Sequence, residues 1–427
     1  MLRWRYHPTR QILPASTEKT MNRIASFLAF TFAAGLAAAC AQDEAVSSGD
    51  LTTTRDTVGD VIHVTNGGTA PSARLELVAS IGPKTLTDTS SPEEFGRVNS
   101  VALGPDGEVF VADARNFEVR VFGLDGAHRR TFGRQGEGPG EFRSLYSLAW
   151  AGDRLLTYDP VQGRIGEWLA EGQWLGQQAT EGGYSGPVSR VRLYPVGPDE
   201  LFRPGFGARY ESEYGSALKS LLIGLNSRGE TGDTLVWLDS PPGGLPSGIV
   251  CQSERMISSF TIPFAPQFVQ HPGPGGITYS ALTSTYRIAV TRNDGADTLR
   301  VIERSLPAEP IHDDEWQAGN QEYQEWRAEM VGASCEPSGP TRSATKPFIE
   351  DLFVAPDGKL WVEVMRTAGN RWEVFDTEGK LLVSFPAPAR GERVVPAFGP
   401  DHLLTIRQDS LDLDHIDVWR LDLERRR

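Results

Sequence analysis

The chain has 427 residues, an ordinary hydrophobic fraction of 39% and a formal charge of −14. Its excess of acidic over basic residues excludes binding to nucleic acid or to anionic lipid headgroups through a global electrostatic field. Only one stretch, residues 24–39, is long and apolar, and it is too short to span a bilayer comfortably.

The apolar stretch follows Arg23 and ends in small residues before Cys40. This pattern predicts a signal peptide over residues 1–39, with Met21 as the true start. Residues 36–40, Leu-Ala-Ala-Ala-Cys, resemble a bacterial lipobox, although the Leu lies four rather than three positions before the Cys. We therefore expect lipidation at Cys40; cleavage at an Ala-x-Ala site, giving a secreted protein, is the alternative. Loss of the signal peptide changes the formal charge from −14 to −18.

Residues 40–73 are rich in Ser, Thr, Gly and Asp. This composition is typical of a flexible tether, here between a lipid anchor and a folded part that begins near Arg74. The expected location is the cell envelope, facing the periplasm or the cell surface, with the membrane contacted only through the anchor.

A unit of about 45 residues recurs along the rest of the chain. Its clearest copies each place a Pro-Asp-Gly turn between two strand-like runs, and two more strand-like runs follow. A four-strand unit cannot bury both faces alone, so it must stack on its neighbours, and closing the stack into a ring gives a β-propeller. We predict an all-β, six-bladed β-propeller of four-stranded blades over residues 74–424. The blades are expected at residues 98–134, 146–178, 191–237 (with a long insertion between its strands), 266–302, 349–385 and 394–421.

The last predicted blade lacks a fourth strand. Residues 75–82 resemble the fourth strand of the first blade, residues 129–133, and a Glu-Phe pair follows both segments. We expect this N-terminal strand to complete the last blade, because a ring closed in this way leaves no exposed sheet edge.

One segment interrupts the repeat between the fourth and fifth blades. Acidic residues followed by large apolar side chains at helical spacing predict an amphipathic helix at about residues 310–332. The apolar residues are Trp316, Tyr323, Trp326 and Met330, and we expect Trp316 and Trp326 to hold the helix against the propeller.

Two cysteines, Cys251 and Cys335, remain if Cys40 is lipidated. In an exported chain an even remainder predicts one disulfide. Metal binding is the weaker alternative, because no second Cys or His lies at ligand spacing near either residue.

Residues 132–142, Phe-Gly-Arg-Gln-Gly-Glu-Gly-Pro-Gly-Glu-Phe, look like the blade connection of bacterial six-bladed β-propeller lipoproteins. Residues 111–122 are similar to the core of an NHL repeat, and residues 347–362 also fit the six-bladed set. The resemblance spans about residues 75–424 and implies the propeller fold. Members of this group are mostly uncharacterised, so it implies little about activity.

Several polar motifs have a structural interpretation. Asp113 and Asn116 bracket a turn, and Asp159 recurs at the same place in the next blade, so we interpret these Asp residues as acceptors for turn amides. The Gly-rich run at residues 136–140 lacks the Lys-Ser/Thr ending of a phosphate loop and is interpreted as a blade linker. The Trp residues of the strands are interpreted as packing between blades.

A propeller lyase or metal-dependent lactonase would need His or carboxylate groups that converge on the central channel. No first strand offers an obvious inward His, Glu350 and Asp351 are the nearest candidates, and no Gly-x-Ser-x-Gly motif occurs. We therefore predict a monomeric binding or scaffold module for a protein, peptide or glycan, without catalytic residues, metal or cofactor. A propeller-type lyase or lactonase is the alternative.

A ligand site is expected on the face that carries the loops between second and third strands and the connections between blades. Arg residues stand out there against a net charge of −18, which favours an acidic or polar partner. The expected binding residues are Arg115, Asn116, Arg143, Gln162 and Arg164.

Overall fold

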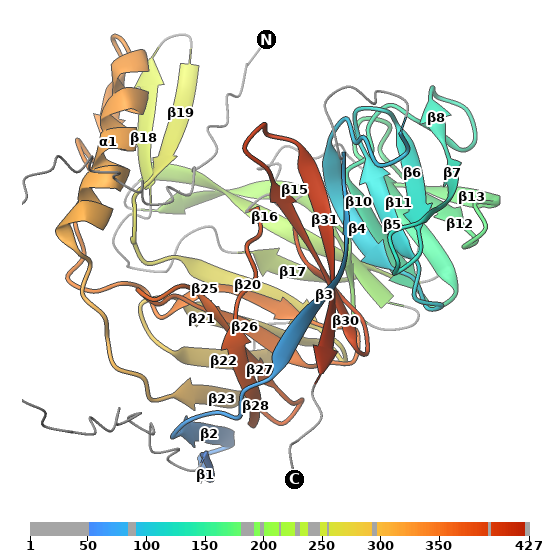
Figure 1. Ribbon diagram of the computed structural model, residues 1–427. Helices are drawn as coiled ribbons and strands as arrows, with labels where there is room; N and C mark the ends of the chain where they lie inside the picture. The colour runs from blue at the N-terminus through green and yellow to red at the C-terminus, as the bar shows by residue number, and fades with distance from the viewer. Residues whose placement is uncertain are drawn as a thin grey trace, which may run out of the picture.

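Figure 1 shows the computed structural model of the chain, which folds mainly into antiparallel sheets. The expected signal peptide and Cys40 lie outside the described residues. The structure describes residues 51–83, 91–180, 192–196, 200–212, 215–226, 231–237, 248–253, 256–292, 297–391 and 394–422.

The first two sheets repeat one four-stranded antiparallel unit in chain order. The first contains β4 (Val98–Leu103), β5 (Val109–Asp113), β6 (Glu118–Phe122) and β7 (His128–Phe132). The second contains β10 (Ser147–Ala151), β11 (Arg154–Asp159), β12 (Arg164–Trp168) and β13 (Trp174–Ala179). The second strand β5 is buried along its whole length, which explains its near-continuous apolar character, whereas the equally buried β12 includes Arg164 and Glu167. The connection holds the short parallel pair β8 (Arg134–Gln135) and β9 (Glu141–Phe142), so the Gly-rich run is a linker, as predicted.

The third and fifth sheets follow the same strand order. The third contains β14 (Tyr194–Pro195), β15 (Glu200–Ser212), β16 (Gly215–Asn226) and β17 (Thr231–Trp237). The fifth contains β25 (Ile349–Val354), β26 (Leu360–Val364), β27 (Arg371–Phe375) and β28 (Leu381–Pro386). The long insertion expected in the third unit is not a separate segment, because β15 and β16 extend into one long hairpin.

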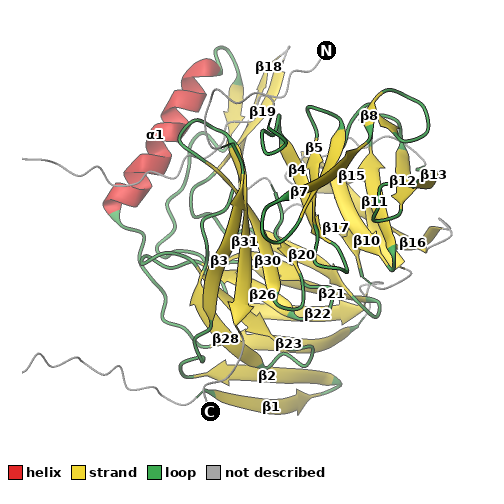
Figure 2. Ribbon diagram, turned by 45° about the vertical axis from the view of Figure 1, so that its right-hand side comes forward, coloured by secondary structure: helices red, strands yellow, loops and turns green. Residues whose placement is uncertain are grey.

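The fourth sheet is wider than predicted. It contains β20 (Phe268–Gly273), β21 (Ile277–Leu282), β22 (Arg287–Arg292) and β23 (Thr298–Arg304), and the hairpin of β1 (Thr52–Val58) and β2 (Val61–Gly67) extends it. Strand β2 pairs in parallel with β23, and Figure 2 shows the hairpin beyond that strand. The expected flexible tether is therefore wrong for residues 52–67, because their Thr, Val and Ile residues favour strands and the edge of β23 supplies backbone partners.

The last sheet joins the two ends of the chain, and Figure 1 shows β3 beside β31. It contains β29 (Ala397–Phe398), β30 (His402–Gln408), β31 (Asp414–Asp422) and β3 (Arg74–Ile81). Ser80 Oγ donates a hydrogen bond to Asp417 Oδ1 at 2.6 Å, and Arg407 Nε donates to Oδ2 at 2.8 Å. The predicted pairing of the N-terminal strand with the C-terminal unit is confirmed.

Residues 52–81, which we call the N-terminal strap, bind three sheets. Asn66 is fully buried, and its side chain donates to Gly379 O at 3.0 Å and accepts from Leu381 N at 2.9 Å. Further along, Ser384 N donates to Pro71 O at 2.9 Å. The strap therefore ties the fourth sheet, through β2, to β28 of the fifth sheet and, through β3, to the last sheet.

Neighbouring sheets pack through apolar clusters. One cluster joins the last sheet to the first, with Leu404 and Ile416 against Val109 and Phe122. Other clusters join the first to the second, the second to the third, the fourth to the fifth and the fifth to the last. The third and fourth sheets meet where the rings of Tyr194 and His271 lie 5.4 Å apart. This succession of packed four-strand units is consistent with a β-propeller.

Four of the sheets share one contact position between the second and third strands, which is filled either by Trp and Thr or by Phe and Val. In two sheets a third-strand Trp donates its indole N–H to a Thr of the second strand, at 3.1 and 2.9 Å. In two other sheets the same ladder positions hold Phe and Val, which need no hydrogen bond. In each case the second-strand residue lies two positions beyond the direct ladder partner of the third-strand residue, and the four diagonal combinations are Trp168–Thr157, Trp419–Thr405, Phe122–Val111 and Phe375–Val362.

A small module is appended to the fourth sheet. It contains α1 (Asp313–Glu329), β18 (Gly248–Ser253), β19 (Met256–Thr261) and β24 (Ser334–Glu336). The helix lies within the predicted span, and the Glu315 carboxylate in its first turn accepts the backbone N–H of His312 at 2.9 Å.

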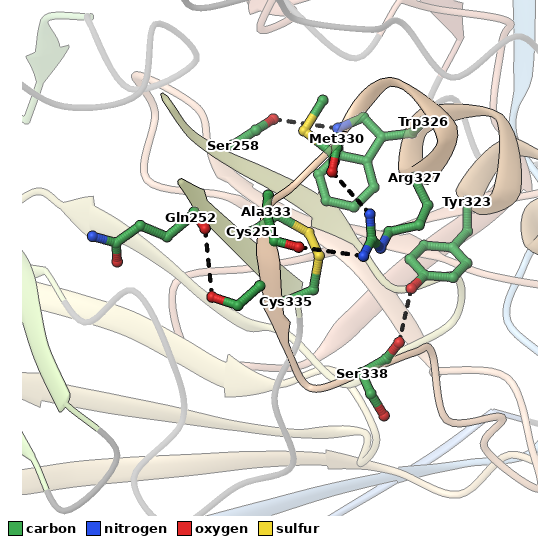
Figure 3. The surroundings of a disulfide bond; sticks show 11 residues. Cys251, Gln252, Ser258, Tyr323, Trp326, Arg327, Met330, Ala333, Cys335 and Ser338 are labelled. Atoms are coloured by element: carbon green, nitrogen blue, oxygen red, sulfur yellow. Dashed lines mark hydrogen bonds between the residues drawn. A yellow bond between two sulfur atoms is a disulfide. The ribbon is translucent and has the colours of Figure 1, made fainter. Parts of the chain in front are cut away.

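The predicted disulfide between Cys251 and Cys335 is confirmed, and it joins β18 to β24 (Figure 3). Trp326 packs against Phe260 of β19 and donates to Ser258 Oγ at 3.3 Å. The expected contact of Trp326 with the propeller is therefore replaced, among the described residues, by contact with β19 of its own module.

Candidate ligand-binding face

Each four-stranded sheet has two distinct ends. Because the strands alternate in direction, the loops after the first and third strands lie at one end, which we call the turn face. The loop after the second strand and the connection to the next sheet lie at the other end, which we call the linker face. All five expected binding residues belong to segments of the linker face in the first two sheets.

Asp113 fixes the linker face of the first sheet. Its fully buried carboxylate accepts the backbone N–H groups of Gly96 and Arg97, at 3.1 and 3.2 Å. It also accepts Asn116 Nδ2 at 2.8 Å and pairs with Arg120 at 3.1 Å. The interpretation of Asp113 as an acceptor for turn amides is confirmed.

Asp159 repeats this arrangement in the second sheet. Its buried carboxylate accepts Arg143 N at 2.8 Å, Ser144 N at 3.2 Å and Gln162 Nε2 at 2.8 Å. Arg164, only 7% exposed, donates to backbone carbonyls of the Gly-rich linker. Two buried carboxylates thus hold two matching linkers in one conformation.

The five expected residues differ in what their side chains contact. Asn116, Gln162 and Arg164 bond to the loops themselves. Arg143 is exposed and pairs with an exposed Glu at 2.6 Å. Arg115 is exposed, and its guanidinium forms no hydrogen bond or ion pair with a described residue. That these residues bind a ligand stays a prediction.

Arg97 is a neighbour of Arg115 that the sequence analysis missed. Ala114 N donates to Arg97 O at 2.8 Å, which joins the two segments. The aliphatic part of the Arg115 side chain packs over Gly96, because a Cβ atom placed on Gly96 would lie only 2.7 Å from Arg115 Cβ. Arg97 is exposed and makes no ion pair with any described carboxylate, so two arginines without an ionic partner among the described residues lie on adjoining segments of the linker face.

A second group of polar side chains includes residues on the first strands of the fourth and fifth sheets. His271 of β20 is 7% exposed, and its Nδ1 lies 2.7 Å from Pro272 O. Burial, together with the nearby Arg192, lowers the pKa of His271 to about 3, so the ring is neutral. Since a carbonyl only accepts, Nδ1 carries the proton and Nε2 remains an acceptor. His271 lies on a first strand and packs against Tyr194 of the third sheet, and the expectation that no first strand offers an obvious inward His stays a prediction.

Arg192 and Asp351 flank this histidine. The guanidinium of Arg192 lies 4.4 Å above the ring of Tyr194, and its buried Nε has no hydrogen-bond partner. Burial raises the pKa of Asp351, against the opposing effect of Arg390 and Arg192, although 37% of its side chain is accessible. We call Arg192, His271, Asp351 and Arg390 the inner-strand cluster.

The charge of Arg390 is matched within the fold. Arg390 donates to Glu363 Oε2 at 2.6 and 2.9 Å, and Asn370 Nδ2 donates to Glu363 Oε1 at 2.9 Å. Asp351 Oδ2 lies 3.8 Å from Arg390, beyond hydrogen-bond distance. Of the two carboxylates suggested by the sequence, Asp351 belongs to the cluster and Glu350 is exposed.

A cavity of about 510 Å³ lies on the opposite, turn face between the first two sheets. Within it Arg130 pairs with Glu108 and donates to Ala170 O at 2.9 Å. The hydrogen bond from Arg130 lowers the pKa of Glu108, against a smaller effect of burial. The central charges of this cavity are therefore engaged with each other.

No helix in the described part of the chain combines the length and apolar character needed to cross a bilayer. No three His, Cys, Asp or Glu side chains there are grouped so as to hold a metal ion.

Comparison with known proteins gives one family match and several distant structural similarities. The model of the NHL repeat matches residues 95–122, which include β4, β5 and β6. No curated protein matches the sequence. A member of the DUF4221 family from Bacteroides vulgatus is similar with a TM-score of 0.43 and 8% identity, over 83% of this chain and 99% of that one.

Two further solved structures are similar at the same level. A protein from Bacteroides fragilis described as exported has a TM-score of 0.39 and 11% identity, over 84% of this chain and 99% of that one. Virginiamycin B lyase from Staphylococcus aureus has a TM-score of 0.38 and 9% identity, over 82% of this chain and 100% of that one. The chain thus contains an NHL repeat and is consistent with a β-propeller module.

Proposed function

We propose that the chain is an exported, lipid-anchored six-bladed β-propeller that binds a protein, peptide or glycan in the cell envelope through its linker face. Six units of four strands, the pairing of β3 with β31 and the packing of the last sheet on the first support a closed ring. Arg23, the apolar residues 24–39 and the small residues before Cys40 support export and lipidation.

One observation carries the binding function. A buried carboxylate at Asp113 holds the segments of the first sheet from which Arg97 and Arg115 project without ionic partners among the described residues, and Asp159 holds the equivalent segments of the second sheet. Binding residues are often loop residues positioned by a rigid scaffold. Exposed guanidinium groups on a chain of net charge −14 favour a partner that presents carboxylate or other acidic groups.

Partner capture tests this proposal. The tagged protein, its R97E/R115E variant and a control variant are each incubated with envelope extract, and bound proteins and glycans are identified. The control, R129E/R154E, reverses two exposed arginines at the turn-face end of the same two sheets. We expect the wild type and the control to capture the same partner and R97E/R115E to lose it, with stability changed by about 0.5 kcal/mol or less.

Capture that is equal in all three proteins would contradict the proposed surface. Turnover of a lactone by the wild type, together with no captured partner, would favour the lyase or lactonase alternative.

A further inference from the structure

We infer that the inner-strand cluster is a second binding site, separate from the exposed arginines of the linker face, and that it takes a small hydroxylated carboxylate. The cluster is assembled from neighbouring sheets, since Arg192 precedes β14 while His271 and Asp351 lie on β20 and β25. Its members therefore converge only when these sheets pack.

Arg192 sets the charge of the ligand. Its guanidinium is held against the face of Tyr194, so its position is fixed before any ligand binds. The buried Nε–H has no acceptor, and a buried donor in this state calls for a bound acceptor. No described carboxylate lies within ion-pair distance of Arg192, so an anionic oxygen is the group that satisfies both its charge and its donor.

The other members of the cluster set the rest of the ligand. His271 keeps Nε2 as an acceptor, because Nδ1–H is committed to Pro272 O and no described donor bonds to Nε2. Asp351 Oδ1 accepts from Leu352 N at 2.8 Å, while Oδ2 lies 3.8 Å from its nearest cation and retains capacity to accept. Two acceptors beside one anion-binding guanidinium match hydroxyl groups placed next to a carboxylate.

The charge balance favours a monoanion over a phosphate dianion. Glu363 already neutralises Arg390 through two hydrogen bonds, so Arg192 is the one cation of the cluster left to bind an anion. Asp351 lies close enough to influence the site, and its carboxylate repels a second negative charge on the ligand. A hydroxy acid with a single carboxylate fits this balance.

Calorimetric titration of the full-length protein at pH 7 tests the inference. The probe is glucuronate, with glucose as the compound that lacks the carboxylate and acetate as the compound that lacks the hydroxyls. We expect saturable binding of glucuronate and at least tenfold weaker binding of both controls. Arg192→Gln should weaken glucuronate binding at least tenfold, whereas Arg154→Gln, which lies outside the cluster, should leave it unchanged.

Two further variants keep the inference testable on its own. If Arg192→Gln does not fold, Asp351→Ala, at a partly accessible side chain, should lower the affinity for glucuronate at least threefold relative to that for acetate, because only glucuronate loses a hydroxyl acceptor. R97E/R115E should bind glucuronate like the wild type, so failure of the linker-face proposal would not change this result. Absence of saturable glucuronate binding, equal binding of acetate, or unchanged binding by folded Arg192→Gln would overturn the inference.

Discussion

The alternation between Trp–Thr and Phe–Val pairs predicts a specific energetic coupling inside the second sheet. Trp168 is 3% exposed, and its indole N–H donates to Thr157 Oγ1, which is itself 1% exposed. Thr157→Val keeps the shape of the side chain but leaves the indole N–H buried without a partner. Trp168→Phe removes the donor, and the double variant recreates the combination that Phe122 and Val111 form at the same diagonal positions of the first sheet.

The magnitudes follow from this geometry. An unsatisfied buried donor costs about 1–3 kcal/mol, so Thr157→Val should destabilise the protein by about 2 kcal/mol. Trp168→Phe should cost about 1–2 kcal/mol, because it opens a small cavity and leaves the Thr hydroxyl without its donor. In the double variant the polar penalty disappears, so it should be about 1–2 kcal/mol more stable than the sum of the single variants predicts.

Urea unfolding of the four proteins, followed by Trp fluorescence and by far-UV circular dichroism, measures this coupling. Coincident transitions are needed before the free energies of unfolding are compared, because a chain of this length can unfold in more than one step. Additivity within about 0.3 kcal/mol would refute the claim that the two residues act as a pair.

Four other outcomes are expected. Asn66→Ala should destabilise the protein by about 2–3 kcal/mol, because Leu381 N and Gly379 O lose their buried partner, and an unchanged urea midpoint would refute the role of the strap. The Cys251–Cys335 bond closes a separation of 84 residues, so its loss should cost up to about 4–5 kcal/mol; two thiols titrated in unreduced protein from the envelope would contradict it. The pKa of Glu108 is lowered in the folded protein, so its ion pair with Arg130 stabilises the fold at neutral pH, and this stabilisation is lost as the pH falls through the lowered pKa. The urea midpoint of Glu108→Gln should therefore fall less between pH 6 and pH 3 than that of the wild type. An identical fall in both proteins would argue against the ion pair. Mass spectrometry should find a lipid-modified N-terminus at Cys40, and an unmodified mature N-terminus would exclude the anchor.

The elements that could be predicted from the sequence depend on local patterns. The repeated strand and turn motifs located the sheets, and the likeness of residues 75–82 to residues 129–133 placed β3 in the last sheet. Helical spacing located α1, and the even number of remaining cysteines indicated the disulfide. These signals lie within single segments or depend on a direct comparison between repeats.

The elements that were missed depend on pairing between distant segments. The hairpin of β1 and β2 has a polar, Thr-rich composition like that of a tether, and it is ordered because β23 offers a sheet edge about 240 residues further along the chain. Strands β18 and β19 become recognisable as part of a module only once Cys335 and α1 are placed against them. A composition that lacks a hydrophobic pattern does not distinguish such strands from loops.

Some features of the candidate site could likewise be predicted from the sequence, and others could not. The role of Asp113 follows from its position before a turn, and Asp159 supports it by repetition. The sequence cannot separate Arg164, which is buried against linker carbonyls, from Arg115, which is exposed. The inner-strand cluster is formed by side chains of several sheets, so no single segment carries its signature.

The affinity of the captured partner, measured against salt concentration for the wild type and for R97E/R115E, tests the central claim most directly. Binding through exposed guanidinium groups weakens as salt screens the charges. The account predicts that charge reversal at Arg97 and Arg115 lowers the affinity at least tenfold at low salt and reduces its salt dependence. An affinity within twofold of the wild type, with the same dependence on salt, would contradict the assignment of the linker face as the binding surface.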